Sequence, residues 1–187
     1  MNHKQRSQRG FTIVELLIVI VVIGILAALV LNSFAGVQAK ARDVERDTDV
    51  KALSTQLEVF YSQAGNGYYP PTYALSSTAS GATGVNLQAD TQVTSKLPGI
   101  DLNSMRAPNK TANSIFFNTT VGGAAPTATS GGAASATNAG IDGYNYQPTS
   151  ASGATACAAE NTCTRFKIYY QREGAPGVLV TKDSLNQ

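Results

Sequence analysis

The chain has 187 residues, of which 43% are hydrophobic, and its formal net charge is +2. Lys4, Arg6 and Arg9 precede residue 10, so 11 of the 14 basic residues remain after it, against 12 acids, and no basic nucleic-acid-binding face is indicated. The single histidine, His3, also precedes residue 10, which leaves no imidazole beyond it for a Ser-His-Asp relay or a metal ion. We therefore predict a chain that is not an enzyme and holds no cofactor.

The first predicted element is a membrane-spanning helix over residues 11–31. This run of 21 residues is apolar apart from Thr12, Glu15 and Gly24. As a helix it would be about 31 Å long, close to the hydrocarbon thickness of a bilayer. It has no polar face, which excludes an amphipathic surface helix. The basic residues before it predict a cytoplasmic amino terminus and export of everything after it.

Glu15 decides among three interpretations of this segment. A secretory signal peptide has an apolar region of about 7–15 residues, so the run is too long, although Ser33-Phe34-Ala35 could serve as a cleavage site. A permanent anchor has no use for an acid that costs up to about 2.5–3.5 kcal/mol in the membrane. A cut after Gly10 would instead create an α-amino group on Phe11. Glu15 could pair with that amine on a neighbouring subunit, because a missed pairing would leave a charge buried alone.

The segment Gly10-Phe11-Thr12-Ile13-Val14-Glu15-Leu16-Leu17 resembles the class III leader junction of type IV pilins and type II secretion pseudopilins. The resemblance is strong over about residues 8–62. It implies that a prepilin peptidase cuts between Gly10 and Phe11 and methylates the Phe11 nitrogen. It also implies that Glu15 is the assembly residue of a homopolymer built by an assembly platform and its ATPase.

One feature departs from the family pattern. Many members carry a proline in the later part of this helix, whereas this chain has none before Pro70. Any local unwinding would have to use Gly24, Asn32 or Gly36.

The same helix is predicted to continue to about residue 63 as an amphipathic segment. Its apolar positions recur at helical spacing. They are Val37, Ala41, Val44, Val50, Leu53, Leu57 and Phe60. We expect this stripe to face a core, and the charged residues between Asp43 and Glu58 to form a solvated face. Gly65, Asn66 and Gly67 supply left-handed positions that end the helix, and Pro70 and Pro71 prevent its return.

Residues 64–140 are rich in Ala, Ser, Thr and Gly and predict a loop region between helix and sheet. We expect a short strand at Ser114-Ile115-Phe116-Phe117 and hydrophobic anchors within this region. The anchors are Leu97, Ile100, Leu102 and Met105. Asn109 and Asn118 match the N-glycosylation pattern, to which we give little weight.

Residues 141–187 predict an antiparallel sheet of three or four strands, with one apolar face for the helix stripe. Phe166, Ile168 and Tyr170 alternate with Arg165, Lys167, Tyr169 and Gln171. Cys157 and Cys163 are the only cysteines. They are too few for a zinc site, and in an exported domain an even pair predicts a disulfide.

Arg165, Lys167 and Arg172 form a local basic group, which we interpret as a solvated strand face rather than a DNA contact. The resemblance keeps a type II secretion pseudopilin and a minor DNA-binding competence pilin open as alternatives. An aromatic-proline element at Tyr68–Pro71 favours the pseudopilin. The calcium-binding acids of many pseudopilins are not evident, since only Asp142, Glu173 and Asp183 lie near the carboxy terminus.

The sequence thus predicts an α+β fold in which a long amino-terminal helix packs on a small carboxy-terminal sheet. The expected parts are a cleaved leader (1–10), an apolar helix (11–35), its amphipathic half (36–63), the loop region (64–140) and the sheet with its disulfide loop (141–187). The expected function is that of a type IV pilus subunit for adhesion, twitching motility or DNA uptake. The subunit would be held in the cytoplasmic membrane before assembly and on the cell surface afterwards. A secreted hydrolase with a membrane anchor lacks a catalytic constellation.

Overall fold

The computed structural model describes residues 11–71, 75, 91–110, 115–117, 125–128, 138–151, 157 and 161–186. The helices are α1 (Ile13–Gln63), α2 (Thr91–Lys96) and the 3-10 helix η2 (Leu102–Met105). The strands are β1 (Ile115–Phe117), β2 (Thr127–Ala128), β3 (Asn138–Ala139), β4 (Tyr144–Thr149), β5 (Arg165–Arg172) and β6 (Ala175–Asp183). Contacts divide the chain into two units, Met1–Ala39 and Lys40–Gln187, and each is described by itself. The predicted leader and Asn118 lie outside the described residues.

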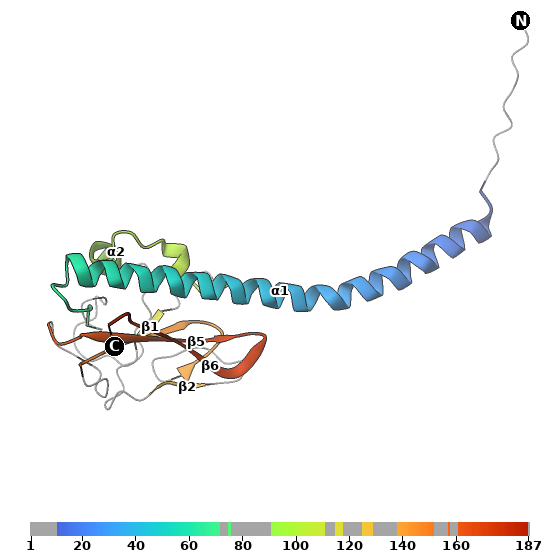
Figure 1. Cartoon of the computed structure of the whole chain (residues 1–187). Helices are drawn as coiled ribbons and strands as arrows, with labels where there is room; N and C mark the ends of the chain where they lie inside the picture. Colours follow the sequence, from blue (N-terminus) through green and yellow to red (C-terminus); the bar gives the residue numbers. More distant parts are fainter. Residues whose placement is uncertain are drawn as a thin grey trace, which may run out of the picture. The chain divides into compact units, whose positions relative to one another are not determined.

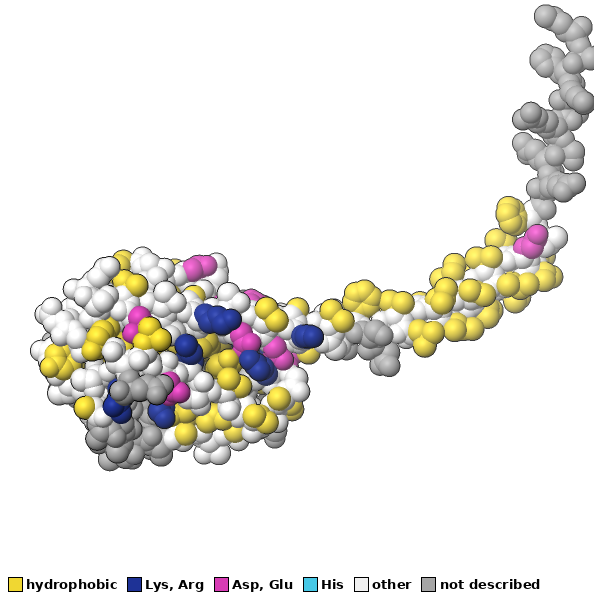
Figure 2. Space-filling model, in the orientation of Figure 1, with side chains coloured by type: hydrophobic (Ala, Val, Ile, Leu, Met, Phe, Trp, Pro, Cys, Tyr) yellow, Lys and Arg dark blue, Asp and Glu magenta, His cyan; other side chains and the backbone are white. Residues whose placement is uncertain are grey.

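The first unit contains the apolar part of α1. Its large hydrophobic side chains up to Val37 are 49–83% exposed, and Figure 2 shows them along the visible face of the helix. Among the described residues, α1 is the one helix that is long and apolar enough to cross a membrane. The predicted helix is confirmed, and it begins two residues after Phe11.

The end of α1 is a tight turn built by two residues in the left-handed region. Asn66 has φ 48° and Gly67 has φ 85°. The Gly67 N–H donates to the carbonyl of Tyr61 at 3.0 Å, and the Gly65 N–H donates to that of Phe60 at 2.7 Å. Gly65 itself is required for space, because a Cβ there would lie 2.0 Å from the carbonyl oxygen of Tyr68. The predicted helix stop is therefore made by Asn66 and Gly67, with Gly65 allowing close approach.

The sheet of the second unit has the strand order β1-β4-β5-β6. β4 and β6 pair with β5 in antiparallel fashion, whereas β1 pairs with β4 in parallel. The antiparallel sheet predicted over residues 141–187 is confirmed as β4, β5 and β6, and the parallel addition of β1 makes the four-stranded sheet mixed. The strand expected at 114–117 is confirmed over Ile115–Phe117, and it joins the main sheet; Ser114 lies outside the described residues. A long connection separates it from β4, and a parallel pair requires such a connection. β2 and β3 form a separate parallel pair.

One face of this sheet packs on the part of α1 that belongs to the second unit, as Figure 1 shows. Val50, Leu53 and Leu57 of the helix are at most 3% exposed and share one core with the sheet. The core also takes side chains from the region between helix and sheet. They are Leu75, Val93, Leu97, Ile100 and Met105. Three of the four predicted anchors are confirmed, but Leu102 is 38% exposed.

The opposite face of the sheet is also buried at its centre. Tyr169 and Gln171, which alternate with the apolar residues of β5, are 4% and 0% exposed. The Gln171 amide donates to the carbonyl of Ala139 in β3, and the Tyr169 hydroxyl donates to Gln147 Oε1 at 3.1 Å. Alternation along β5 therefore separates two buried faces rather than a buried from a solvated one.

The predicted apolar stripe of α1 is wrong upstream of Val50. Val37 and Val44 are 64% and 58% exposed. Val44 precedes Leu53 by nine residues, and at 3.6 residues per turn this places the two side chains on opposite sides of the helix. Asp43 and Arg46 precede Val50 and Leu53 by seven residues each, so they lie on the core-facing side.

Candidate functional site

The start of α1 is closed by a reciprocal pair of side chains, Thr12 and Glu15. The Thr12 N–H and hydroxyl both donate to Glu15 Oε2, at 2.8 and 2.7 Å. In return, the Glu15 N–H donates to the Thr12 hydroxyl oxygen at 3.3 Å. This is a capping box, which satisfies donors that a helix start otherwise leaves without partners. The Glu15 carboxylate therefore lies at the amino-terminal end of the helix, where the helix dipole favours negative charge.

The capping box also defines where the helix begins relative to the predicted cleavage point. Phe11 precedes the helix and is 82% exposed. Gly10 lies outside the described residues, so the cut before Phe11 stays a prediction. Thr-x-x-Glu before an apolar run is the sequence signature of a capping box. It identifies Thr12, in addition to Glu15, as a functional residue at the helix start.

A second charged group, the α1–hairpin ion cluster, consists of Arg42, Asp43, Arg46, Asp47, Arg172 and Glu173. Arg42 binds Glu173 in bidentate fashion, with Nε–Oε1 and Nη2–Oε2 distances of 2.9 and 2.6 Å. Arg46 binds Glu173 Oε1 at 2.8 Å and Asp43 Oδ1 at 3.0 Å. The hydrogen bond from Arg42, with that from Arg46, lowers the pKa of Glu173 to about 2.

The turn between β5 and β6 is held to α1 by backbone contacts as well. Asp43 accepts hydrogen bonds from the N–H groups of Glu173 and Gly174, at 2.7 and 2.9 Å. Arg46 is 2% exposed, although it carries a full charge. The expectation of a solvated charged face between Asp43 and Glu58 is therefore wrong for this part of the helix. The charged residues of α1 in the cluster join the helix to the sheet, because each binds Arg172 or Glu173 of the β5–β6 hairpin.

Asp47 and Asp49 connect α1 to tyrosines of the sheet. Asp47 accepts from the Tyr170 hydroxyl at 2.8 Å and pairs with Arg172 at 2.7 Å. Burial alone would raise the pKa of Asp47, but the hydrogen bonds from Arg172 and Tyr170 outweigh it and lower that pKa. Asp49 accepts from the Tyr144 hydroxyl at 2.7 Å. Burial dominates there and raises the pKa of Asp49 to about 6.

The predicted basic group does not form one patch. Arg172 lies on the helix side of the sheet, where it pairs with Asp47. Arg165 and Lys167 alternate with the core residues of β5 and so lie on the other face, where Lys167 is 3.8 Å from Asp183. The structure thus separates Arg172 from the other two side chains.

The acids near the carboxy terminus each have a basic partner. Lys110 lies 3.2 Å from Asp142, Lys167 lies 3.8 Å from Asp183, and Glu173 belongs to the ion cluster. Within the described part of the chain, no three His, Cys, Asp or Glu side chains are grouped so that they could hold a metal ion.

Cys157 and Cys163 are joined in a disulfide, with their Cα atoms 5.5 Å apart. The bridge closes the connection just before β5. The Tyr69 N–H donates to the carbonyl of Cys163 at 2.6 Å, so the disulfide loop is tied to the segment that follows α1.

Comparison with known proteins matches the amino-terminal part of the chain. Residues 5–31 match the family model of the prokaryotic N-terminal methylation motif. The chain is 40% identical over 68 residues to the type II secretion system core protein G of Dickeya chrysanthemi, covering 36% of this chain and 43% of that protein. It is 46% identical over 55 residues to the type IV major pilin protein PilA of Myxococcus xanthus, covering 29% and 25% of the two chains.

A further core protein G, that of Escherichia coli (strain K12), is 40% identical over 66 residues, covering 35% of this chain and 44% of that protein. The chain therefore spans less than half the length of the curated relatives described here. No solved structure matches the chain significantly. The family model covers the start of the apolar helix and the residues just before it, and each alignment with a relative leaves most of this chain uncovered.

Proposed function

We propose that this chain, which belongs to the superfamily of type IV pilins and type II secretion pseudopilins, is the structural subunit of a type IV pilus. The observation that carries the proposal is the position of Glu15. Its carboxylate lies at the start of a membrane-length apolar helix, within the segment that matches the N-terminal methylation motif. The role is structural rather than enzymatic, in keeping with that family.

The proposed route begins in the cytoplasmic membrane. Prepilin peptidase cuts between Gly10 and Phe11 and methylates the new amino group. A secondary amine of this kind remains protonated near neutral pH and can neutralise a carboxylate. Glu15 of one subunit then meets the Phe11 amine of its neighbour while the apolar helices exchange lipid contact for contact with one another. A subunit in the wrong register would leave both charges unpaired in an apolar core, which is strongly destabilising.

A type II secretion pseudopilin is the second candidate, favoured by the names of several relatives. The matched segment is common to both classes, so the carboxy-terminal unit has to separate them. Many pseudopilins bind calcium through acids near the carboxy terminus. Here Asp142, Glu173 and Asp183 already pair with basic side chains, which supports the pilus subunit. We expect unfolding of this chain to be insensitive to calcium or its chelation. A clear calcium-dependent rise in melting temperature would favour the pseudopilin.

Intact-mass spectrometry of purified fibres tests the processing step. The expected mass is that of a chain that begins at N-methyl-Phe11 and contains the disulfide. A chain that begins at Met1, or near Gly36, would contradict the proposal.

Replacement of Glu15 by Ala tests the assembly step. The variant should insert into the membrane and be cut, yet give few or no fibres, because the Phe11 amine has no buried partner. Glu45→Ala is the matched control, since Glu45 is an exposed acid on the same helix. Normal fibre yield from Glu15→Ala would overturn the pairing role, whereas loss of fibres in both variants would point to a general defect.

A minor competence pilin remains a third reading, and it would require DNA affinity. With Arg165 and Lys167 on one face and Arg172 on the other, we expect at most weak, salt-sensitive binding. Binding that is abolished by Arg165→Ala with Lys167→Ala, at unchanged fold, would support the competence reading.

A further inference from the structure

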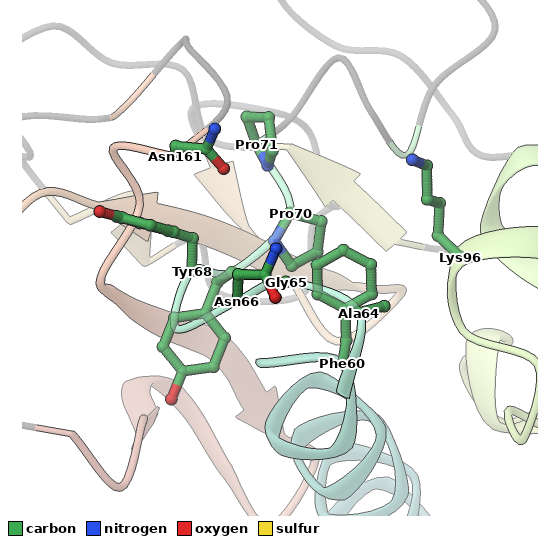
Figure 3. A pocket seen from close by; sticks show the side chains of 10 residues that line it. Phe60, Ala64, Gly65, Asn66, Tyr68, Pro70, Pro71, Lys96 and Asn161 are labelled. Carbon is green, nitrogen blue, oxygen red and sulfur yellow. The ribbon is translucent and has the colours of Figure 1, made fainter. Parts of the chain in front are cut away.

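A pocket of about 130 Å³ lies at the carboxy-terminal end of α1 (Figure 3). Three separate segments form its walls. The end of α1 and the turn after it contribute Phe60, Tyr68, Pro70 and Pro71. The end of α2 contributes Lys96, and the disulfide loop contributes Asn161. Figure 3 shows Asn161 and Lys96 approaching from different sides of the two prolines.

The walls of this pocket are built into the fold. The tight turn at Gly65 brings the chain onto Phe60, since a Cβ at Gly65 would lie 2.9 Å from the Phe60 ring. Tyr69, in the same turn, is 1% exposed and meets the ring of Phe166 edge-on at 4.8 Å. The Tyr69 N–H donates a hydrogen bond to the carbonyl of Cys163, so the turn and the disulfide loop are held together. A cavity formed in this way needs little reorganisation to accept a ligand.

The polar side chains of the pocket are available to bind a ligand. Asn66 and Asn161 are exposed and hold left-handed backbone conformations, with φ 48° and 62°. Among the described residues, no hydrogen bond or ion pair engages the side chains of Asn66, Asn161 or Lys96, and no carboxylate lines the pocket. Two carboxamides and an ammonium group therefore surround a floor of aromatic and proline rings.

We propose that this pocket binds a single neutral hexopyranose unit, such as the end of an extracellular polysaccharide. The volume is close to that of a cavity that holds one benzene, about 150 Å³, so a pyranose ring would enter in part and leave some of its hydroxyls at the open mouth of the pocket. The C–H face of a pyranose can pack on Phe60 and the proline rings. Its hydroxyls both donate and accept, which matches the carboxamides of Asn66 and Asn161. Lys96 supplies a further donor.

The position at the end of α1 disfavours an anionic ligand. A helix leaves its last carbonyl groups without intrahelical partners and carries partial negative charge at that end. The turn already occupies the carbonyls of Phe60 and Tyr61, but the partial negative charge at the helix end still disfavours a phosphate or carboxylate. A single Lys96 offers only one opposing charge. This inference goes beyond the filament role, and either can fail without the other.

Saturation-transfer NMR on the full-length chain tests the proposal. The chain should be held in micelles of a detergent without a sugar headgroup, and offered the methyl glycosides of glucose, galactose and N-acetylglucosamine. We expect transfer to at least one glycoside, with a dissociation constant on the order of 1 mM, as suits a small ligand. Benzoate and glucuronate serve as anionic comparison ligands. No transfer to any of the three glycosides, or transfer only to benzoate or glucuronate, would overturn the proposal.

Variants locate the binding. Asn161→Ala should weaken the best glycoside about fivefold, the effect of losing one hydrogen bond. Lys96→Gln, at an exposed position, provides a second variant if Asn161→Ala disturbs the disulfide loop. Lys51→Ala is the control, because Lys51 is exposed on α1 and does not line the pocket. Equal affinity in all three variants would show that the sugar binds elsewhere and would overturn the assignment.

Discussion

The two units of this chain differ in how a charged side chain near apolar residues is stabilised. In the first unit, Glu15 is the single charged residue between Phe11 and Leu31, and its described partner is Thr12, three residues away. In the second unit, Arg46 is buried with two carboxylates, one of which lies 127 residues further along the chain. A local contact leaves Glu15 available for the assembly role that we propose, whereas contacts between distant segments make Arg46 part of the folded core.

A large loss of stability in the second unit is expected from the replacement of Arg46. Arg46→Ala removes a buried cation from Glu173, which keeps Arg42, and from Asp43, which keeps two backbone N–H donors. We therefore expect the free energy of unfolding to fall by about 3 kcal/mol, the lower end for breaking a buried pair. Urea unfolding of the full-length chain in micelles measures this, with Lys51→Ala as a control within about 0.5 kcal/mol of the parent. A loss below 1 kcal/mol would mean that the cluster is not a stabilising contact.

Matched leucine substitutions sharpen the difference between the units. Leu57 is fully buried, and Leu57→Ala should lower the free energy of unfolding of the second unit by about 2–5 kcal/mol. Leu17 is 55% exposed, so Leu17→Ala should leave that unfolding transition unchanged. Similar losses from the two variants, measured by near-ultraviolet circular dichroism in micelles, would contradict the division into units.

Asp49 makes the free energy of unfolding depend on pH, with a sign opposite to that of a carboxylate in an ion pair. Its pKa of about 6 exceeds the ordinary value of 3.8, so the folded chain binds this proton more tightly. This contribution is fully present below about pH 4 and is lost as the pH rises through 6. Asp49→Asn, which keeps an acceptor for Tyr144, should raise the free energy of unfolding at pH 7.5 by about 1–2 kcal/mol. No gain at pH 7.5 relative to pH 4 would show that burial does not penalise this carboxylate.

The smallest effect is expected at Thr12. Thr12→Ala removes the capping hydroxyl and should destabilise the first turn of α1 by about 0.5–2 kcal/mol. Amide exchange at Ile13 to Leu16 should accelerate, whereas the unfolding of the second unit should not change. Thr12→Ser is the control, because serine retains the hydroxyl. Unchanged exchange in Thr12→Ala would show that the capping box does not hold the helix start.

Local patterns predicted the elements that depend on neighbouring residues. Residues 11–31 could be read as a spanning helix because their apolar character is continuous, and Asn66 and Gly67 could be read as its end because few residues tolerate positive φ. The same local reading failed at Val37 and Val44. Helical spacing shows which residues share a face, but it does not show which face meets the sheet.

Adjacent residues specify the apolar helix, the acid at its start, the leader-junction motif and the strand-like carboxy-terminal part. Three other features could be seen only in the folded chain: the burial of Asp43 and Arg46, the parallel pairing of β1, and the separation of Arg172 from Arg165 and Lys167. The reason is physical. Whether a charge is solvated or buried depends on partners brought by distant segments, and the partner of Arg46 becomes its neighbour only when the β5–β6 turn folds against α1.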